Sequence, residues 1–266
     1  MDDWSALANV RGAMPVLPPG HVWLAGAGPG DPGLLTLYAL AGLAHADVIV
    51  HDALVDKRVL ALAGAQARLE FAGKRGGRPS ALQADISKRL IELAKEGRRV
   101  LRLKGGDPCI FGRGGEEAMA LAAAGIPFRI IPGVTSGLAA LAAASIPATV
   151  RQVNRAIILA AGHGGEEDGY DWGPLARTGE PIVLYMVMHN LERVAAALIA
   201  AGRQPKTPAA IIVAATTPAE RILVSTLERI AADAREHALE SPAIAVIGDI
   251  VKMRDHLLAT VANRKP

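Results

Sequence analysis

The sequence that decides the fold is Gly26-Ala27-Gly28-Pro29-Gly30-Asp31-Pro32-Gly33. Four apolar residues at 22–25 lead into this segment, and the apolar residues of 34–41 follow it with a helical spacing. A short apolar run, a glycine-rich turn and a helical period together predict a strand, a loop and a helix. In α/β proteins such a loop is where ligands bind, because glycine lets a bound molecule approach the backbone closely.

Segment 28–33 also matches the G-x-G-x-x-G pattern of dinucleotide-binding proteins, and Asp52 follows about twenty residues later, as that pattern requires. However, Pro29 and Pro32 lack the N–H groups with which such a loop binds a pyrophosphate. A loop so poor in donors suits a ligand without phosphates. A nicotinamide-dependent oxidoreductase is therefore the less favoured alternative.

Composition and charge narrow the class of protein. The 266 residues can form one large or two moderate α/β domains, and 51% of them are hydrophobic, so a substantial core can form. The net charge of +3 and the 3% of aromatic residues argue against nucleic acid as a partner. The single cysteine, Cys109, excludes an internal disulfide and fits a reducing cytoplasm.

Two further features concern location. Residues 1–4 are acidic where a signal peptide would be basic. The longest nearly uncharged apolar stretch, 137–149, is too short to span a bilayer. We expect a cytoplasmic protein that does not enter the membrane.

The first half of the chain alternates strand and helix patterns. Apolar runs predict strands at 22–25, 48–50, 68–72, 100–103 and 128–131. Helices are expected over 34–44, from a capping box of Ser80 and Gln83 to Gly97, and over 116–124. This alternation favours a mainly parallel sheet covered by helices. Asp52, Lys74 and Asp107 each follow a strand, so they are expected at the sheet edge where such proteins bind ligands.

The second half predicts another α/β lobe after a break at 132–137. Its expected strands are 156–161, 181–187, 209–214 and 243–247. An Ala-rich helix is expected to end at 144, and a second helix is expected over 190–201. A third helix is expected over 226–238, opened by Ser225 and Glu228. We therefore divide the chain into an N-terminal arm, 1–19, an N-terminal α/β domain, 20–134, and a C-terminal α/β domain, 135–266.

Five motifs carry a resemblance to a known family. They are the segment 26–33, Gly73-Lys74-Arg75-Gly76-Gly77, Arg102-Leu103-Lys104-Gly105-Gly106-Asp107-Pro108, Phe111-Gly112-Arg113-Gly114-Gly115-Glu116-Glu117 and Ile131-Pro132-Gly133-Val134-Thr135-Ser136-Gly137. In this order and spacing the chain resembles the tetrapyrrole methylases over about residues 20–255. The run from Arg102 to Glu117 is the most specific part of the match.

The resemblance implies an α/β fold of two lobes with the cofactor cleft between them, and a homodimer. It also implies an enzyme that uses S-adenosyl-L-methionine to methylate uroporphyrinogen III at C2 and C7. The products would be precorrin-2, for sirohaem and cobalamin biosynthesis, and S-adenosyl-L-homocysteine. A methylase acting on a later precorrin and a non-catalytic ligand-binding regulator are the remaining alternatives.

The resemblance also implies roles for individual residues. Asp52 matches the proton acceptor and Lys74 the proton donor. The matched cofactor positions are Pro29, Gly105, Gly106, Asp107, Ile110, Thr135, Ser136, Met186, Ala215 and Ala243. Because the electron-rich pyrrole carbon can attack the sulfonium methyl directly, no metal is required, and the histidines show no metal-ligand spacing.

Uroporphyrinogen is a polycarboxylate, so its site should be rich in arginine, whose guanidinium binds a carboxylate through two N–H groups. The assigned substrate residues are Arg75, Arg113 and Arg151, with Arg78, Arg102 and Arg155 as further candidates. Glu116 and Glu117 are interpreted as complements of a helix N-terminus without a catalytic role.

Each assignment has a purely structural alternative. Asp52 could cap a helix or turn, Lys74 could be a solvated lysine, Asp107 could belong to an ordinary turn, and Met186 could be a core residue. Cys109 stands where relatives usually have an aromatic residue, and we interpret it as a small packing residue rather than a reactive thiol. Further departures occur at Val150 and in Ala161-Gly162-His163.

Overall fold

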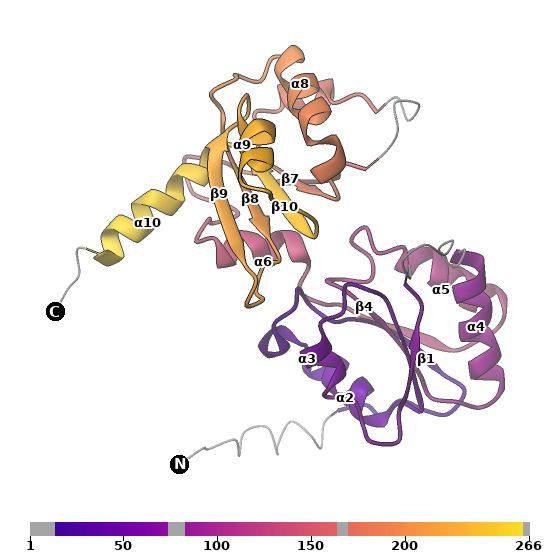
Figure 1. The fold of residues 1–266 in the computed structure, drawn as a ribbon. Coiled ribbons are helices and arrows are strands. Elements are labelled where there is room, and N and C mark those ends of the chain that lie inside the picture. The colour runs from indigo at the N-terminus through magenta and orange to yellow at the C-terminus, as the bar shows by residue number, and fades with distance from the viewer. Residues whose placement is uncertain (1–13, 74–82, 164–169, 263–266) are drawn as a thin grey trace. The chain divides into compact units, whose positions relative to one another are not determined.

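The computed structural model describes residues 14–73, 83–163 and 170–262, and the chain divides into two compact units, 1–135 and 136–266 (Figure 1). Each unit contains a five-stranded sheet. The expected α/β class is confirmed.

The first unit is built on a parallel sheet with the strand order β3-β2-β4-β1-β5. Its strands are β1 (Val22–Gly26), β2 (Val48–His51), β3 (Arg68–Phe71), β4 (Val100–Lys104) and β5 (Phe128–Ile131). Its helices are the 3₁₀ turn η1 (Pro32–Leu34), α2 (Leu37–His45), α3 (Lys57–Leu60), α4 (Gln83–Lys95) and α5 (Gly114–Ala123).

Helices cover both faces of this sheet, as Figure 1 shows for β1 and β4, with α2 and α3 on one side and α4 and α5 on the other. Trp23 and Leu101 pack with Leu43 of α2 on one face. The alternate residues Leu24 and Val100 pack on the other, in the cluster that holds the apolar residues of α4 and α5. Because both faces are covered, β1 and β2 read as nearly continuous apolar runs in the sequence.

The expected strands of the first half are confirmed, while the helix boundaries differ. The helix expected over 34–44 begins at Leu37, because the Thr36 hydroxyl accepts a hydrogen bond from the Ala39 N–H at 3.2 Å and caps it there. The short helix α3, capped by Asp56, was not expected. The predicted capping box at Ser80 lies outside the described residues.

Three glycines from different loops meet at the carboxyl edge of the first sheet. A Cβ atom on Gly133, after β5, would lie 2.2 Å from the Gly106 carbonyl oxygen, after β4. A Cβ atom on Gly26, the last residue of β1, would lie 2.4 Å from the same oxygen and 2.6 Å from the Gly133 Cα. Because these distances leave no room for a side chain, only glycine lets the three backbones touch.

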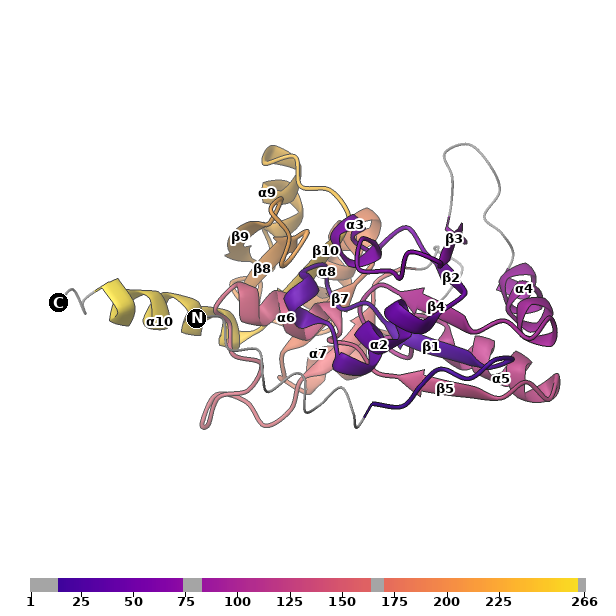
Figure 2. The ribbon, with the colours of Figure 1, turned by 90° about the horizontal axis from the view of Figure 1, so that it is seen from below.

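The second unit is built on a mixed sheet with the order β6-β7-β10-β8-β9, in which only β6 and β7 pair in parallel. Its strands are β6 (Ile158–Ala161), β7 (Ile182–Tyr185), β8 (Pro208–Val213), β9 (Arg221–Thr226) and β10 (Ala243–Ile247). Its helices are α6 (Ser136–Ala143), α7 (Gly173–Arg177), η3 (Met188–Asn190), α8 (Leu191–Ala200), α9 (Ile230–Glu236), η4 (Asp249–Lys252) and α10 (Met253–Ala262). Within its own unit, α10 projects away from the sheet (Figure 2).

The helix expected over 226–238 is wrong in its first part. Residues 221–226 form β9 instead, which pairs antiparallel with β8, and the helix begins only at Ile230. Ser225 lies within the strand, and its hydroxyl donates to Asp233 Oδ2 at 2.5 Å rather than capping a helix. The β-branched residues Ile222 and Val224 favour a strand here and outweigh the capping pattern.

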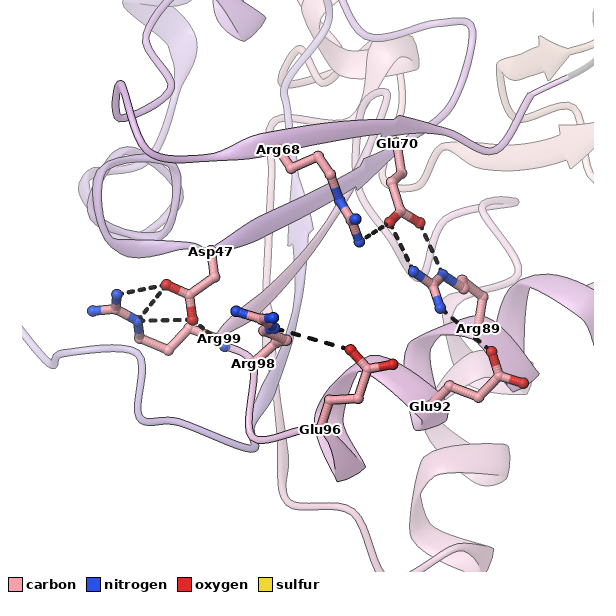
Figure 3. Close-up of polar contacts among 8 residues, drawn as sticks. All are labelled: Asp47, Arg68, Glu70, Arg89, Glu92, Glu96, Arg98 and Arg99. Carbon is pink, nitrogen blue, oxygen red and sulfur yellow. Dashed lines mark hydrogen bonds and ion pairs between the residues drawn. The ribbon is translucent and has the colours of Figure 1, made fainter.

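At the opposite end of the first sheet, charged residues form balanced ion pairs (Figure 3). Asp47, just before β2, accepts from the Arg99 backbone N–H at 2.8 Å and from the Arg99 guanidinium Nη2 at 2.6 Å. Arg99 hydrogen bonds hold the pKa of the Asp47 carboxyl below its ordinary value of 3.8. On the edge strand β3, Glu70 accepts two hydrogen bonds from Arg89 of α4, both at 3.0 Å.

The first prediction concerns this ion pair. We expect Asp47→Asn to lower the free energy of unfolding at pH 7 by about 1 kcal/mol, because the pair is partly solvated. A carboxyl with a lowered pKa stabilises the fold above its ordinary pKa, and that contribution is lost as the pH falls through the folded value. Urea unfolding should therefore show a difference in the free energy of unfolding between the wild type and Asp47→Asn that is smaller at pH 3 than at pH 7. The exposed Glu240→Gln is the control. An equal loss at both pH values would contradict the assignment.

The second prediction concerns the glycine contact. Gly133→Ala should destabilise the protein by about 1–3 kcal/mol, because the added methyl group overlaps the Gly106 carbonyl. Gly115→Ala is the matched control: Gly115 lies in α5 with no atom within 4 Å of its Cβ position, and alanine favours the helix. Chemical denaturation should show a loss for the first variant and no loss for the second. Two variants of equal stability would refute the close contact.

Candidate active site

The glycine-rich loop after β1 bonds to the loop after β4. The Gly28 N–H donates to the Gly106 carbonyl at 3.1 Å, and the Gly106 N–H donates back to the Gly28 carbonyl at 2.7 Å. The Gly33 N–H is taken by Asp31 Oδ1 at 2.8 Å, and the next α-helix begins only at Leu37. This loop therefore differs from a dinucleotide site, where free amides at a helix N-terminus face the pyrophosphate.

Asp107 ties the loop after β4 to the loop after β5. Its Oδ2 accepts from the Gly133 N–H at 3.0 Å, and its Oδ1 accepts from the Cys109 N–H at 2.8 Å. The residue thus has the turn role that we considered as its structural alternative. Each carboxylate oxygen keeps a further lone pair, so the same group can also accept from a bound ligand.

Asp52 lies at the same edge, directly after β2. Its Oδ1 accepts from the Leu54 N–H at 3.0 Å, and its Oδ2 is 3.4 Å from the Gly105 N that donates to it. A Cβ atom on Gly105 would lie 2.7 Å from the Leu54 Cβ, so this neighbour must be glycine for the two loops to approach. The structure therefore brings the expected proton acceptor beside the expected cofactor loop.

The rest of the loop after β4 presents apolar side chains to solvent. Ile110 and Phe111 are 36% and 40% exposed, and Phe111 and Arg113 have positive φ angles of 53° and 59°. Such strained backbone persists where the surrounding structure holds it, and it gathers at binding sites. The Arg113 guanidinium makes two hydrogen bonds to Glu116, at 2.8 and 2.6 Å, on the surface.

The structure corrects the interpretation of Cys109. Its side chain is exposed, so it is not a packing residue. Desolvation of the thiol, followed by the negative charge of Asp107, raises its pKa above the ordinary 9.0. The thiol therefore stays protonated near neutral pH, as expected for an unreactive cysteine.

Arg102 and Glu117 also differ from expectation. Arg102 is buried, and its guanidinium donates to Glu117 Oε1 at 3.0 Å and to the Val50 carbonyl at 3.3 Å. It is therefore not available to a substrate carboxylate. Glu117 is fully buried and also accepts from Lys104 Nζ at 3.2 Å and from Gln83 at 2.9 Å, so it does not simply complement a helix N-terminus.

Sequence reasoning missed the buried lysine of this cluster. The signal was the alternation Arg102-Leu103-Lys104 on a strand, which places both cations on one face. The strand pattern alone gives no reason to expect that this face is buried.

The remaining expected site residues of the first unit fall into two groups. Thr135 is buried and Pro29 is half-buried. Lys74, Arg75 and Arg78 lie outside the described residues.

In the second unit, three expected cofactor residues come to one sheet edge. Met186 follows β7, Ala215 lies two residues after β8, and Ala243 begins β10. They share an edge because β10 is antiparallel to both neighbours, with Ile244 opposite Tyr185 and Ala243 opposite Val213.

Met186 is not the core residue that its strand-end position suggested. It is 46% exposed and has a φ angle of +53°, a strained conformation for a side chain of this size. Ala214 and Thr216, on either side of Ala215, have φ angles of +45° and +66°. Strained backbone thus occurs at one expected cofactor position, Met186, and on both sides of another, Ala215.

The first turn of α6 is held at the same edge. Its Gly137 N–H donates to the Tyr185 hydroxyl at 3.0 Å, and a Cβ atom on Gly137 would lie 2.2 Å from that oxygen. Tyr185, which directly precedes Met186, therefore fixes the start of α6, where Ser136 is the first residue. The candidate substrate residues Arg151 and Arg155 are exposed in this unit.

Within the described part of the chain, no three His, Cys, Asp or Glu side chains are grouped as metal ligands. No helix in that part is long and apolar enough to cross a bilayer.

Residues 21–231 match the family model described as Tetrapyrrole (Corrin/Porphyrin) Methylases. A uroporphyrinogen-III C-methyltransferase of Sinorhizobium sp is 53% identical over 244 residues, which are 91% of this chain and 87% of that protein. A siroheme synthase of Methylococcus capsulatus is 45% identical over 90% of this chain, and the chain spans 51% of that protein.

Solved structures of similar methyltransferases also resemble this chain. A uroporphyrin-III C-methyl transferase from Thermus thermophilus, complexed with S-adenosyl homocysteine, has a TM-score of 0.75 and 38% identity, and the match covers 88% of this chain and 99% of that one. A cobalt precorrin-4 methyltransferase has a TM-score of 0.78 and 28% identity, with 87% and 96% covered. Since the family model covers most of the chain and similar relatives align along nearly all of it, the chain belongs to the tetrapyrrole (corrin/porphyrin) methylases.

Proposed function

We propose that this protein transfers methyl groups from S-adenosylmethionine to C2 and C7 of uroporphyrinogen III, giving precorrin-2 and S-adenosylhomocysteine. The observation that carries the proposal is the relative named uroporphyrinogen-III C-methyltransferase, which is 53% identical over 87% of its own length. The cobalt precorrin-4 methyltransferase, at 28% identity, supports a later precorrin as substrate less strongly.

The loops of the first unit suit a cofactor without phosphates. The amides of Gly28 and Gly106 donate to each other's carbonyl groups. The Asp107 carboxylate, in contrast, keeps lone pairs that can accept from the ammonium of the cofactor's amino-acid end. We assign the cofactor contacts to Pro29, Gly105, Gly106, Asp107, Ile110, Thr135, Ser136, Met186, Ala215 and Ala243. The strained, exposed Met186 supports this assignment, because a core residue would have neither property.

S-adenosylmethionine supplies a methyl group on a positively charged sulfur. The pyrrole carbon attacks this methyl group in line, so the carbon–sulfur bond breaks as the new carbon–carbon bond forms. The protein's main contribution is then alignment of the two reactants, which can supply roughly 7–11 kcal/mol.

The reaction also releases a proton. We assign the removal of this proton to Asp52 and the donation of a proton to Lys74. Hydrogen bonds from Leu54 and Gly105 already orient the Asp52 carboxylate at the sheet edge. A base in a fixed position needs no reorganisation when the proton moves.

We assign the substrate carboxylates to Arg75, Arg113 and Arg151. Arg113 binds Glu116 on the surface and would exchange this partner for a substrate carboxylate. Arg151 is exposed, and no hydrogen bond or ion pair involves its side chain within the described residues. We also propose that the protein is a cytoplasmic homodimer that binds neither nucleic acid nor membranes.

The proposal is tested directly by incubation with uroporphyrinogen III and isotope-labelled S-adenosylmethionine, followed by mass spectrometry of the tetrapyrrole. We expect two labelled methyl groups per macrocycle. Methylation of later precorrins alone, or cofactor binding without turnover, would contradict it in favour of a different methylase or of a regulator.

For Asp52 we expect Asp52→Ala to lower kcat by roughly 10²–10⁴-fold, the usual contribution of a general base. The dissociation constant for S-adenosylhomocysteine should stay within a few-fold of the wild-type value. Asp52→Asn, which keeps an acceptor for the Leu54 N–H, should lose as much activity. Asp56→Asn, four residues further on, is the control and should remain active. Unchanged turnover in both Asp52 variants would remove this residue from the mechanism.

A further inference from the structure

The buried cluster beneath the carboxyl end of β4 holds more positive than negative charge. Arg102 and Lys104 have side chains that are only 3% and 5% exposed, and both donate to the same oxygen of the fully buried Glu117. The third donor to this oxygen, Gln83, is neutral. Two cations therefore face one carboxylate.

Charge balance at Glu117 does not require the second cation. Arg102 alone would balance Glu117, and its guanidinium also bonds the Val50 carbonyl of the neighbouring strand β2. A buried ammonium costs free energy unless its charge is matched. Burial, followed by the charge of Arg102, accordingly lowers the pKa of the Lys104 amine below its ordinary 10.5, while Glu117 and Asp52 act in the opposite direction.

The excess charge lies next to the proposed base. Lys104 is the last residue of β4, and β4 pairs with β2, where Leu103 stands opposite His51. The residues that follow, Lys104 and Asp52, therefore lie side by side at the sheet edge. The backbone confirms this position, because the Gly105 N–H donates to Asp52 Oδ2.

We propose that Lys104 is a positioning residue for methyl transfer: its buried ammonium, held by Glu117, places a fixed positive charge beside the Asp52 carboxylate and keeps that carboxylate oriented. This inference rests on the proposed function. Lys104 touches neither reactant and acts only through Asp52. A buried charge beyond what ion pairing requires is typical of residues retained for activity at the expense of stability.

The test is the pair of variants Lys104→Met and Lys104→Arg. Methionine keeps the apolar stem and leaves Glu117 paired with Arg102, so Tm should be unchanged or higher. We expect kcat to fall about ten-fold or more, as when one preorganised charge is removed. The KM for S-adenosylmethionine and the dissociation constant for S-adenosylhomocysteine should stay within about two-fold, since positioning acts on the transition state. Lys104→Arg, which restores the charge, should recover much of kcat.

Arg102→Met is the matched control, because it removes a cation from the same Glu117 two residues further from the edge. It should lower Tm and leave kcat close to that of the wild type. A parallel loss of Tm and kcat in both methionine variants, or wild-type kcat in Lys104→Met, would overturn the proposal. Failure of both Lys104→Met and Lys104→Gln to fold would also overturn it, since the charge would then be structural.

The wild-type enzyme is measured in the same assay. If the wild type does not methylate uroporphyrinogen III, the proposed function fails. If the wild type is active and Lys104→Met equals it, only the role of Lys104 fails.

Discussion

The first unit depends on the direct backbone contact of Gly26, Gly106 and Gly133. Because no side chain separates them, the loops after β1, β4 and β5 leave the sheet in touch with one another. Asp107 can then reach the Gly133 N–H, and Gly105 can reach Asp52. A single close approach therefore brings residues from separate motifs to one edge, where open α/β sheets bind their ligands.

The two ends of this sheet differ in their electrostatics. At the amino end, Asp47 and Arg99 form a balanced, partly solvated pair that contributes modestly to stability. At the carboxyl end, Lys104 and Arg102 are both buried and share one carboxylate, that of Glu117. In the proposed mechanism, stability and activity therefore depend on residues at opposite ends of the same strands, and a change at one end should leave the other largely unaffected.

The sequence predicted every described strand except β9, because apolar runs followed by glycines have few alternative structures. It could not predict the Glu117 cluster, since burial of a charge depends on a partner from another element, here α5 against β4. Ser225 was wrongly predicted for a related reason: a capping pattern fits two environments, and only the pairing of β9 with β8 distinguishes them. The strand-end position of Met186 also fits two environments, and its backbone φ and exposure argue against the core alternative. The local sequence pattern therefore indicated the candidate site, while the charges buried beside it could be identified only from the assembled structure.

The parallel sheet also sets the order in which this edge can assemble on the ribosome. Its first strand, β1, pairs with β4 and β5, so Val22 cannot pair until Val100 and Phe128 have been synthesised. Contacts so distant along the chain close slowly and leave intermediates with exposed strands. The loop 26–33 emerges first, yet it gains its partner glycines only once Gly133 has left the exit tunnel. A nascent chain shorter than this would expose an incomplete sheet to chaperones and would lack the contact between the loops after β1, β4 and β5.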